Sequence, residues 1–237
     1  MKKFFNKIAI VIIAGCCVIA SCGKKDSTTT PTTTAPANTS SATVSGTSYS
    51  ATNQIILPTD SASALSNYSQ GNYPSLPSGG GYVSLMGSYP IGTDTVAGHV
   101  LTGSVYSYIF GQAVVSSSND TLTWGFTIAS LGSEIKAGTY AFTPLTSDTT
   151  TDTNLITALI SGTSPTLAAG YYGDSKQLFN DSVSTGSVTI TSISTADSTI
   201  VGSYTLDVIG TKGSVPPTIT ISNAQFNIHY ENLKTTK

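Results

Sequence analysis

The feature that most constrains the fold is a strict two-residue alternation between residues 121 and 129. Leu122, Trp124, Phe126 and Ile128 are apolar, and Thr, Gly or Ala fills the positions between and after them. Successive side chains of a β-strand point to opposite faces of its sheet, so this spacing predicts a strand with one buried face and one face in water. Trp124 is therefore expected in the core.

Two hairpins are expected around this signal. Residues 104–115 form the preceding strand, and the polar segment 117–120 supplies the turn. A second hairpin pairs residues 187–193 with residues 199–209 across a turn at 194–197. In its return strand Ile200, Gly202, Tyr204, Leu206 and Val208 share a face.

The last expected strand follows Pro216-Pro217 and changes parity along its length. Ile219 and Ile221 are odd-numbered, whereas Phe226, Ile228 and Tyr230 are even-numbered. A regular strand cannot place both sets on one side, so a bulge is expected near residues 222–225.

These strands predict an all-β chain, an antiparallel two-layer β-sandwich, with a small closed β-barrel as the alternative. Evidence for helices is thin. Residues 59–67 have a capping Asp60, residues 154–161 fit a short helix or a strand, and residues 69–81 read as a long loop.

Composition excludes one large class of function. Only 9% of the 237 residues are charged, and all ten basic residues are lysines. Nucleic-acid binding needs a basic face, and arginine is the residue best suited to phosphate groups, so no nucleic-acid partner is expected.

The N-terminus has the pattern of a lipoprotein signal. Lys2, Lys3 and Lys7 precede an apolar run from Ile8 to Ala20, which is too short to span a bilayer as a helix. The sequence Ile19-Ala20-Ser21-Cys22 resembles a bacterial lipobox, with an ordinary secretory signal as the alternative. Residues 1–21 are thus expected to be removed and Cys22 to be acylated, for example with palmitate. The mature chain then keeps no free thiol, since the other cysteines are Cys16 and Cys17.

Residues 22–43 are expected to form the lipidated cysteine and a Thr/Pro-rich tether, and residues 44–237 the β-sandwich domain. Gly23 follows the cysteine in place of the aspartate that favours retention in the inner membrane. The outer membrane, with the domain on either side of it, is therefore the expected location.

Both ends of the domain resemble uncharacterised lipoprotein families of Bacteroidota. Residues 44–51 (VSGTSYSA) match an opening V-x-G-x-x-aromatic-x-A pattern, and residues 137–140 match an internal G-T-Y strand start. Residues 186–191, 201–206 and 219–228 resemble the three closing strands of these families. The shared motifs are structural, and the resemblance implies an envelope lipoprotein without implying an activity.

No motif predicts an enzyme. A G-x-S-x-G elbow is absent, and Ser133 with Lys136 matches S-x-x-K without its companion elements. His99 and His229 have no partner at metal-ligand spacing, and Glu134 and Glu231 are the only glutamates. Asp148, Asp152 and Asn154 could offer oxygen ligands, but a solvated turn is the favoured interpretation. No metal or cofactor is expected.

Tyrosines are the first group of candidate contact residues. Exposed tyrosines can stack on sugars or anchor protein contacts, although they can also cover the end of a sandwich. The candidates bracket the expected loop or lie in a Tyr-Tyr pair: Tyr68, Tyr73, Tyr82, Tyr89, Tyr171 and Tyr172.

A second group consists of hydroxyl residues that follow aspartate. Seven of the ten aspartates precede Ser or Thr and then Ala, Ile, Leu, Val, Met or Thr. This triplet resembles the acceptor of the general O-glycosylation system of Bacteroidota, and turn formation by Asp-Ser/Thr pairs is the alternative. The candidate acceptors are Ser27, Ser61, Thr95, Thr121, Thr149, Ser182 and Ser198.

The sequence thus predicts a non-enzymatic, membrane-anchored binding or structural module with a glycan or an envelope protein as its partner. An unrecognised hydrolase and a barrel that carries a small apolar ligand are the alternatives.

Overall fold

The computed structural model describes residues 37–56, 80–90, 94–96, 99–101, 105–117, 120–143, 159, 165–173, 178–179, 185–209 and 218–232. Every named element within these residues is a β-strand, and the single described residue Leu159 has a helical backbone. In chain order the strands are β1 (Thr39–Val44), β2 (Thr47–Ala51), β3 (Asn53–Gln54), β4 (Gly81–Pro90), β5 (Asp94–Val96), β6 (His99–Leu101), β7 (Val105–Ser117), β8 (Asp120–Leu131), β9 (Gly138–Ala141), β10 (Thr166–Gly173), β11 (Leu178–Phe179), β12 (Thr185–Ser194), β13 (Thr199–Ile209), β14 (Thr218–His229) and β15 (Glu231–Asn232).

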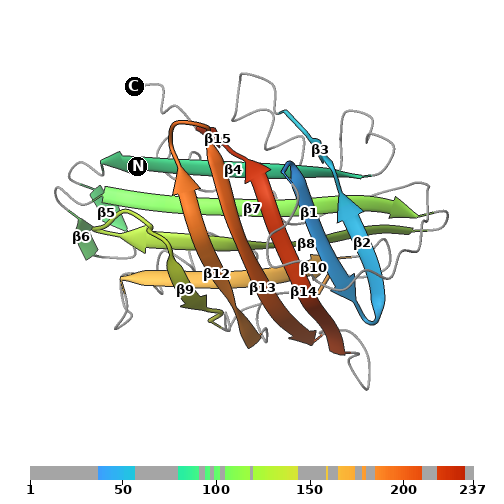
Figure 1. Cartoon of the computed structure of the whole chain (residues 1–237). Coiled ribbons are helices and arrows are strands. Elements are labelled where there is room, and N and C mark those ends of the chain that lie inside the picture. The colour runs from blue at the N-terminus through green and yellow to red at the C-terminus, as the bar shows by residue number, and fades with distance from the viewer. Residues whose placement is uncertain are drawn as a thin grey trace.

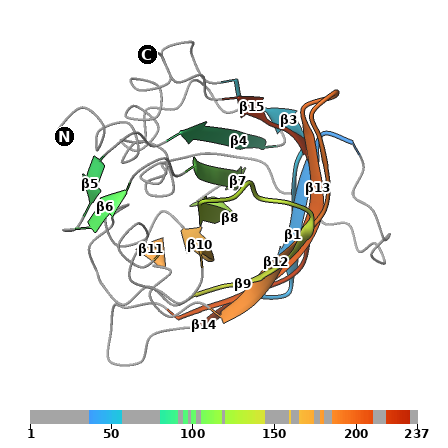
Figure 2. The same ribbon diagram turned by 90° about the vertical axis from the view of Figure 1, so that its left-hand side faces the viewer.

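Two sheets pack against each other, which confirms the predicted sandwich over the closed barrel. Sheet A has the order β2-β1-β14-β13-β12-β9, and sheet B has the order β11-β10-β8-β7-β4-β15, with β3 also beside β4. The long strands of sheet B cross behind those of sheet A in Figure 1, and the two layers stand apart in Figure 2. Pairing is antiparallel except where the short strands β3 and β15 lie parallel to β4.

Within the described residues, short segments carry the chain from one sheet to the other. At Thr52 it leaves β2 for β3, and at Tyr230 it leaves β14 for β15. After β9, Phe142 donates a backbone hydrogen bond to Gly186 of sheet A, and Thr143 donates one to Ala168 of sheet B. Strands that switch sheets at such corners are typical of sandwiches whose strands cross.

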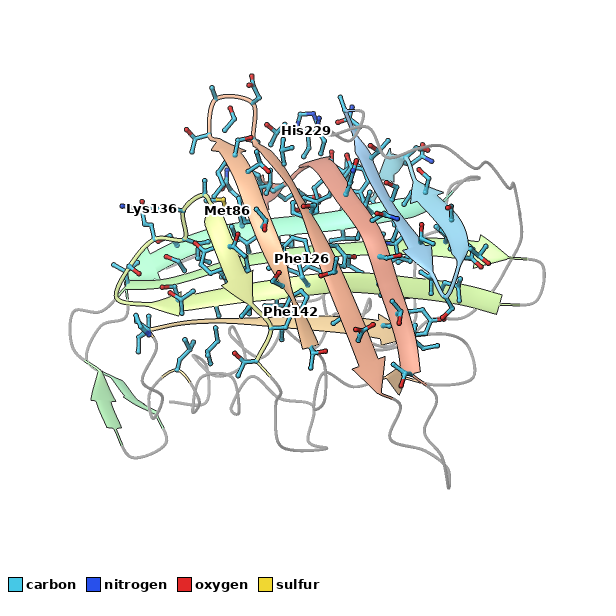
Figure 3. The ribbon with its side chains drawn as sticks, turned by 60° about the horizontal axis from the view of Figure 1, so that its bottom comes forward. Met86, Phe126, Lys136, Phe142 and His229 are labelled. Carbon is cyan, nitrogen blue, oxygen red and sulfur yellow. The ribbon has the colours of Figure 1, made fainter. Side chains whose placement is uncertain are left out.

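Aromatic side chains fill the space between the sheets. The ring centroid of Phe126 on β8 lies 4.8 Å from that of Phe226 on β14 and 5.6 Å from that of Tyr204 on β13. Trp124 is fully buried and packs 6.1 Å from the ring of Tyr49, so its predicted core position is confirmed. Figure 3 shows Phe126 among the crossing strands and His229 and Lys136 toward the periphery.

One prediction about β8 is wrong: its Thr face does not meet water. Thr121, Thr123 and Thr127 are all buried, as are the alternate positions of the neighbouring strand β7. Sheet B is therefore buried on both faces. In Figure 2, β5 and β6 lie on the side of sheet B that faces away from sheet A.

The predicted hairpins and the predicted bulge are present. Strands β7 and β8 pair along their whole length, and β12 and β13 pair across a turn at residues 195–198. The register of β13 with β14 shifts between the pairs Tyr204–Ala224 and Leu206–Ile221, next to Asn223 with φ of 51°. This bulge brings Ile221 and Phe226 onto the same buried side, as expected.

The domain starts earlier than predicted. Strand β1 begins at Thr39 and pairs with both β2 and β14, so the last residues assigned to the tether belong to sheet A. Ser40, Ala42 and Val44 are the buried positions of β1, and small side chains suffice there because the strand lies inside the sheet.

Several predicted segments lie outside the described residues: the signal, Cys22, the tether before residue 37, both candidate helices apart from the buried Leu159, and most of the loop at 69–81. Within the part of the chain that is described, no helix is long and apolar enough to cross a membrane.

Candidate functional site

The outer surface of sheet A carries an unbroken row of small polar side chains. Strand pairing places one residue from each of the six strands side by side in the order Ser50, Ser41, Gln225, Ser203, Thr189 and Thr139. We call these six residues the ladder. Neighbouring strands lie about 4.8 Å apart, so five steps span about 24 Å.

The ladder is open to solvent along its length. Ser50, Ser203 and Thr139 are exposed, and Ser41, Gln225 and Thr189 are partly exposed. At one end the hydroxyl oxygens of Thr139 and Thr189 are hydrogen-bonded at 2.9 Å. Each hydroxyl can still donate or accept a further bond, because Ser and Thr carry one donor and two acceptor lone pairs.

Further polar residues extend the ladder into a surface. In the next row Ser48, Thr43 and Ser222 lie side by side, and the hydroxyl oxygens of Thr43 and Ser48 are 3.3 Å apart. We call this surface, with the ladder, the hydroxyl face.

Charged groups lie only at the margins of the hydroxyl face among the described residues. Asp207 is exposed and pairs in register with Thr220 and Thr185, beyond the second row. At the opposite end of the strands, Nδ1 of His229 lies 2.9 Å from the carbonyl oxygen of Asp197. The side chain of His229 is half-buried.

Aromatic residues of sheet A point to the opposite side. Tyr49 and Tyr140 occupy the alternate positions of β2 and β9 and pack against the core. The Tyr140 hydroxyl donates a hydrogen bond to the carbonyl oxygen of Lys136 at 2.7 Å. The hydroxyl face therefore offers hydrogen bonds without a stacking platform from these strands.

The tyrosine hypothesis is corrected at two positions. Tyr82 is completely buried, and Tyr172 is 4% exposed, so neither can be the surface contact that the sequence suggested. Both point between the sheets because they share the face of Trp124 in register, where apolar burial outweighs the cost of covering a hydroxyl. Tyr68 and Tyr73, and the side chains of Tyr89 and Tyr171, lie outside the described part of the chain.

The candidate acceptors for glycans likewise differ in whether their side chains are buried, exposed or outside the described part of the chain. Thr121 is completely buried, so in the folded protein it is no acceptor, contrary to the prediction. Ser198 lies in the β12–β13 turn with a φ of 51° and is partly exposed. Thr95 lies in β5 with its side chain undescribed, and Ser27, Ser61, Thr149 and Ser182 fall outside the described residues.

The structure does not assemble the weak catalytic motif. Ser133 and Lys136 lie in the segment between β8 and β9 instead of on a helix. The hydroxyl oxygens of Ser133 and Ser130 are hydrogen-bonded at 2.9 Å. In the described ranges, no three His, Cys, Asp or Glu residues form a group that could hold a metal ion. Asp148, Asp152 and Asn154 lie outside those ranges.

Comparison with known proteins gave no match to any family model, curated protein or solved structure. The class that the fold defines is an all-β protein of two packed antiparallel sheets.

The ladder was missed in the sequence. The alternation that marks the buried positions of β13 also predicts that Ser203 and Thr205 face outward. The sequence therefore indicates the polar surface of this one strand. The register that joins Ser50 to Thr139 through four other strands has no local signature.

Proposed function

We propose that the protein is a lipoprotein of the bacterial outer membrane, anchored through Cys22, whose sandwich binds an uncharged glycan on the hydroxyl face. The observation that supports this function is the ladder, which lines up six uncharged hydrogen-bonding side chains across all six strands of sheet A. The protein acts by binding and carries out no reaction.

The chemistry of the ladder suits a polyol. Sugar hydroxyls both donate and accept hydrogen bonds, and the hydroxyls of Ser203, Thr189 and Thr139 can adopt either role. A charged polymer would have to give up hydration without a charged partner on the ladder, which is unfavourable. The length of the ladder, about 24 Å, favours an extended chain over a single sugar.

The anchor suits the same task. Two or more acyl chains give stable membrane attachment, whereas one chain alone binds marginally. The Thr/Pro-rich segment after Cys22 would hold the sandwich away from the lipid by at most tens of ångströms. A binding module in that position meets polysaccharides at the cell envelope.

Affinity electrophoresis tests the proposal. The chain from residue 22, with Cys22→Ser to prevent lipidation, retains every described strand because the first begins at Thr39. It is run through gels that contain the neutral polymers dextran, laminarin or arabinogalactan, or the charged polymers alginate or heparin. Retardation by at least one neutral polymer and by neither charged polymer is expected.

A pair of arginine variants locates the binding surface. Ser203→Arg places a bulky charge in the middle of the ladder, and Ala196→Arg places the same group on an exposed turn away from it. Ser203→Arg should weaken binding by tenfold or more, and Ala196→Arg should leave it unchanged. Equal behaviour of the two variants, or the absence of binding to all three neutral polymers, would overturn the proposal.

A further inference from the structure

A second row of outward-facing side chains runs beside the ladder on sheet A. Strand pairing places one residue of each strand in this row, in the order Ser48, Thr43, Ser222, Thr205, Ser187 and Ala141. We call these six residues the second row. Ser48, Thr205 and Ala141 are exposed, and the other three are partly exposed, so the row is open to solvent as the ladder is.

The bulge of β14 keeps the second row continuous. The register of β13 with β14 shifts at this point, so that Ser222 and Asn223 lie opposite Thr205. Ser222 also pairs with Thr43 of β1, and the row therefore crosses the bulge without a break. Asn223 is exposed and adds a side-chain amide beside the row.

Two spacings describe the surface that the rows form together. Along each row, neighbouring side chains are about 4.8 Å apart, because this is the distance between paired strands. On every strand except the bulged β14, the two rows are two residues apart, which is about 6.8 Å. The strands that carry both rows lie side by side in front of sheet B in Figure 1. The hydroxyl face is thus a band of two parallel rows across sheet A.

An extended chain of pyranose sugars has the same two-edged layout. In a β-1,4-linked chain each sugar advances by about the spacing of neighbouring strands, and polar groups project along both edges of the ribbon. A hexopyranose presents ring hydroxyls at one edge and a hydroxymethyl group at the other. These groups donate and accept hydrogen bonds, as do the side chains of Ser and Thr. A chain that lies along the rows can therefore place one edge over each of them.

We propose that the hydroxyl face binds a single β-1,4-linked chain of neutral hexopyranoses, which lies across the six strands with one edge on the ladder and the other on the second row. This inference rests on the proposed glycan binding and specifies the linkage, the sugar class and the orientation. Adjacent strands of a sheet are rotated by about 20–25°, so the rows turn along their length. A single chain can follow this turn through its glycosidic bonds, whereas packed crystalline chains cannot.

Calorimetric titration with three neutral hexasaccharides tests the ligand class. Cellohexaose is an extended hexopyranose chain, xylohexaose lacks only its hydroxymethyl groups, and maltohexaose contains the same sugar in a chain that coils. The chain from residue 22 with Cys22→Ser should bind cellohexaose about tenfold more tightly than either of the others, since each of these leaves one row with fewer hydrogen bonds. Equal or tighter binding of xylohexaose or maltohexaose, or no binding of cellohexaose, would overturn the inference.

Substitutions on the single strand β13 test the orientation. Ser203→Ala removes a hydroxyl of the ladder, and Thr205→Val removes a hydroxyl of the second row with nearly equal shape. Both side chains are exposed, so these variants should fold. Each should weaken the binding of cellohexaose severalfold. Thr199→Val is the control, because Thr199 lies on the same strand beyond the ladder, and it should leave binding unchanged.

Thr205→Ser, which keeps the hydroxyl and loses the methyl group, should bind cellohexaose as the parent does. Its recovery would show that the hydroxyl of the second row, and not a change of fold, is what Thr205→Val loses.

The outcomes separate this inference from the proposed function. Weaker binding in Ser203→Ala with unchanged binding in Thr205→Val would show that the chain contacts one row only, which overturns the orientation and leaves glycan binding in place. An equal loss in Thr199→Val would overturn the orientation as well. If cellohexaose does not bind, retardation by dextran, laminarin or arabinogalactan would still support a glycan-binding face, whereas no retardation by any of them would overturn both.

Discussion

The side-chain oxygens of Thr139 and Thr189 lie 2.9 Å apart and join the edge strand β9 to β12 on the outer surface of sheet A. One residue further along each strand, Tyr140 and Val188 are paired in register on the opposite side and contribute to the core. The two sides of sheet A thus separate hydrogen bonding from apolar burial.

Trp124→Ala should lower the free energy of unfolding by about 3–5 kcal/mol, because the ring is fully buried between the sheets. Urea unfolding followed by circular dichroism measures this, since Trp124 is the only tryptophan and fluorescence would be lost. Ile56→Ala is the control, as Ile56 is 72% exposed and should change stability by less than about 0.5 kcal/mol. Equal effects of the two substitutions would contradict the core assignment.

Gly202→Ala should destabilise the sandwich by about 1–3 kcal/mol. A Cβ atom at Gly202 would collide with the Thr189 carbonyl oxygen and with the ring of Phe226, and a packed backbone yields poorly to such a contact. The adjacent Ser203→Ala, which points to solvent, should cost little. Chemical denaturation of both variants checks this, and a neutral Gly202→Ala would mean that β12 and β13 are further apart.

Stability should fall as the pH rises above about 10. Burial raises the pKa of the Tyr204 hydroxyl far above its usual value of 10.0, and burial also raises the pKa of Tyr82. In the unfolded chain these tyrosines lose their protons near pH 10, so the unfolded state binds fewer protons and is favoured above that pH, by up to about 1.4 kcal/mol per pH unit for the fully buried Tyr204. Below pH 10 these tyrosines keep their protons in both states, so their full contribution to the free energy of unfolding is retained.

Tyr204→Phe provides the control for this pH dependence. Phenylalanine keeps the ring contacts with Phe126 and Phe226 but cannot ionise. Urea unfolding between pH 8 and pH 11.5 should therefore show a shallower fall in the variant than in the parent. Identical slopes would show that Tyr204 is accessible to hydroxide in the folded state.

Modification by glycans, if the host carries the expected system, should reach Ser198 and spare Thr121. Ser198 lies in an exposed turn, whereas the Thr121 side chain is completely buried. Peptide mass spectrometry of protein from the native host distinguishes the two sites. A glycan on Thr121 would require modification before folding.

Sequence reasoning succeeded where neighbouring residues carry the signal. The alternation at Leu122, Trp124 and Phe126 predicted the strand β8 and the side chains that it directs toward sheet A. The parity change between Ile221 and Phe226 predicted the bulge in β14. Both inferences use only the two-residue period of a strand, which is a local property of the backbone.

Tertiary structure alone decided which hydroxyl residues are buried and which are exposed. Thr123 and Thr189 occupy similar Ser/Thr-rich strands, yet one is buried in sheet B and the other lies on the hydroxyl face. Threonine is compatible with either environment, so its identity does not predict its burial. The side chains of the ladder meet only through strand register, which depends on pairings between residues far apart in the chain. The sequence by itself determined the strands with a clear two-residue alternation and the inward residues of those strands. The packing of one sheet on the other decided what the remaining residues face.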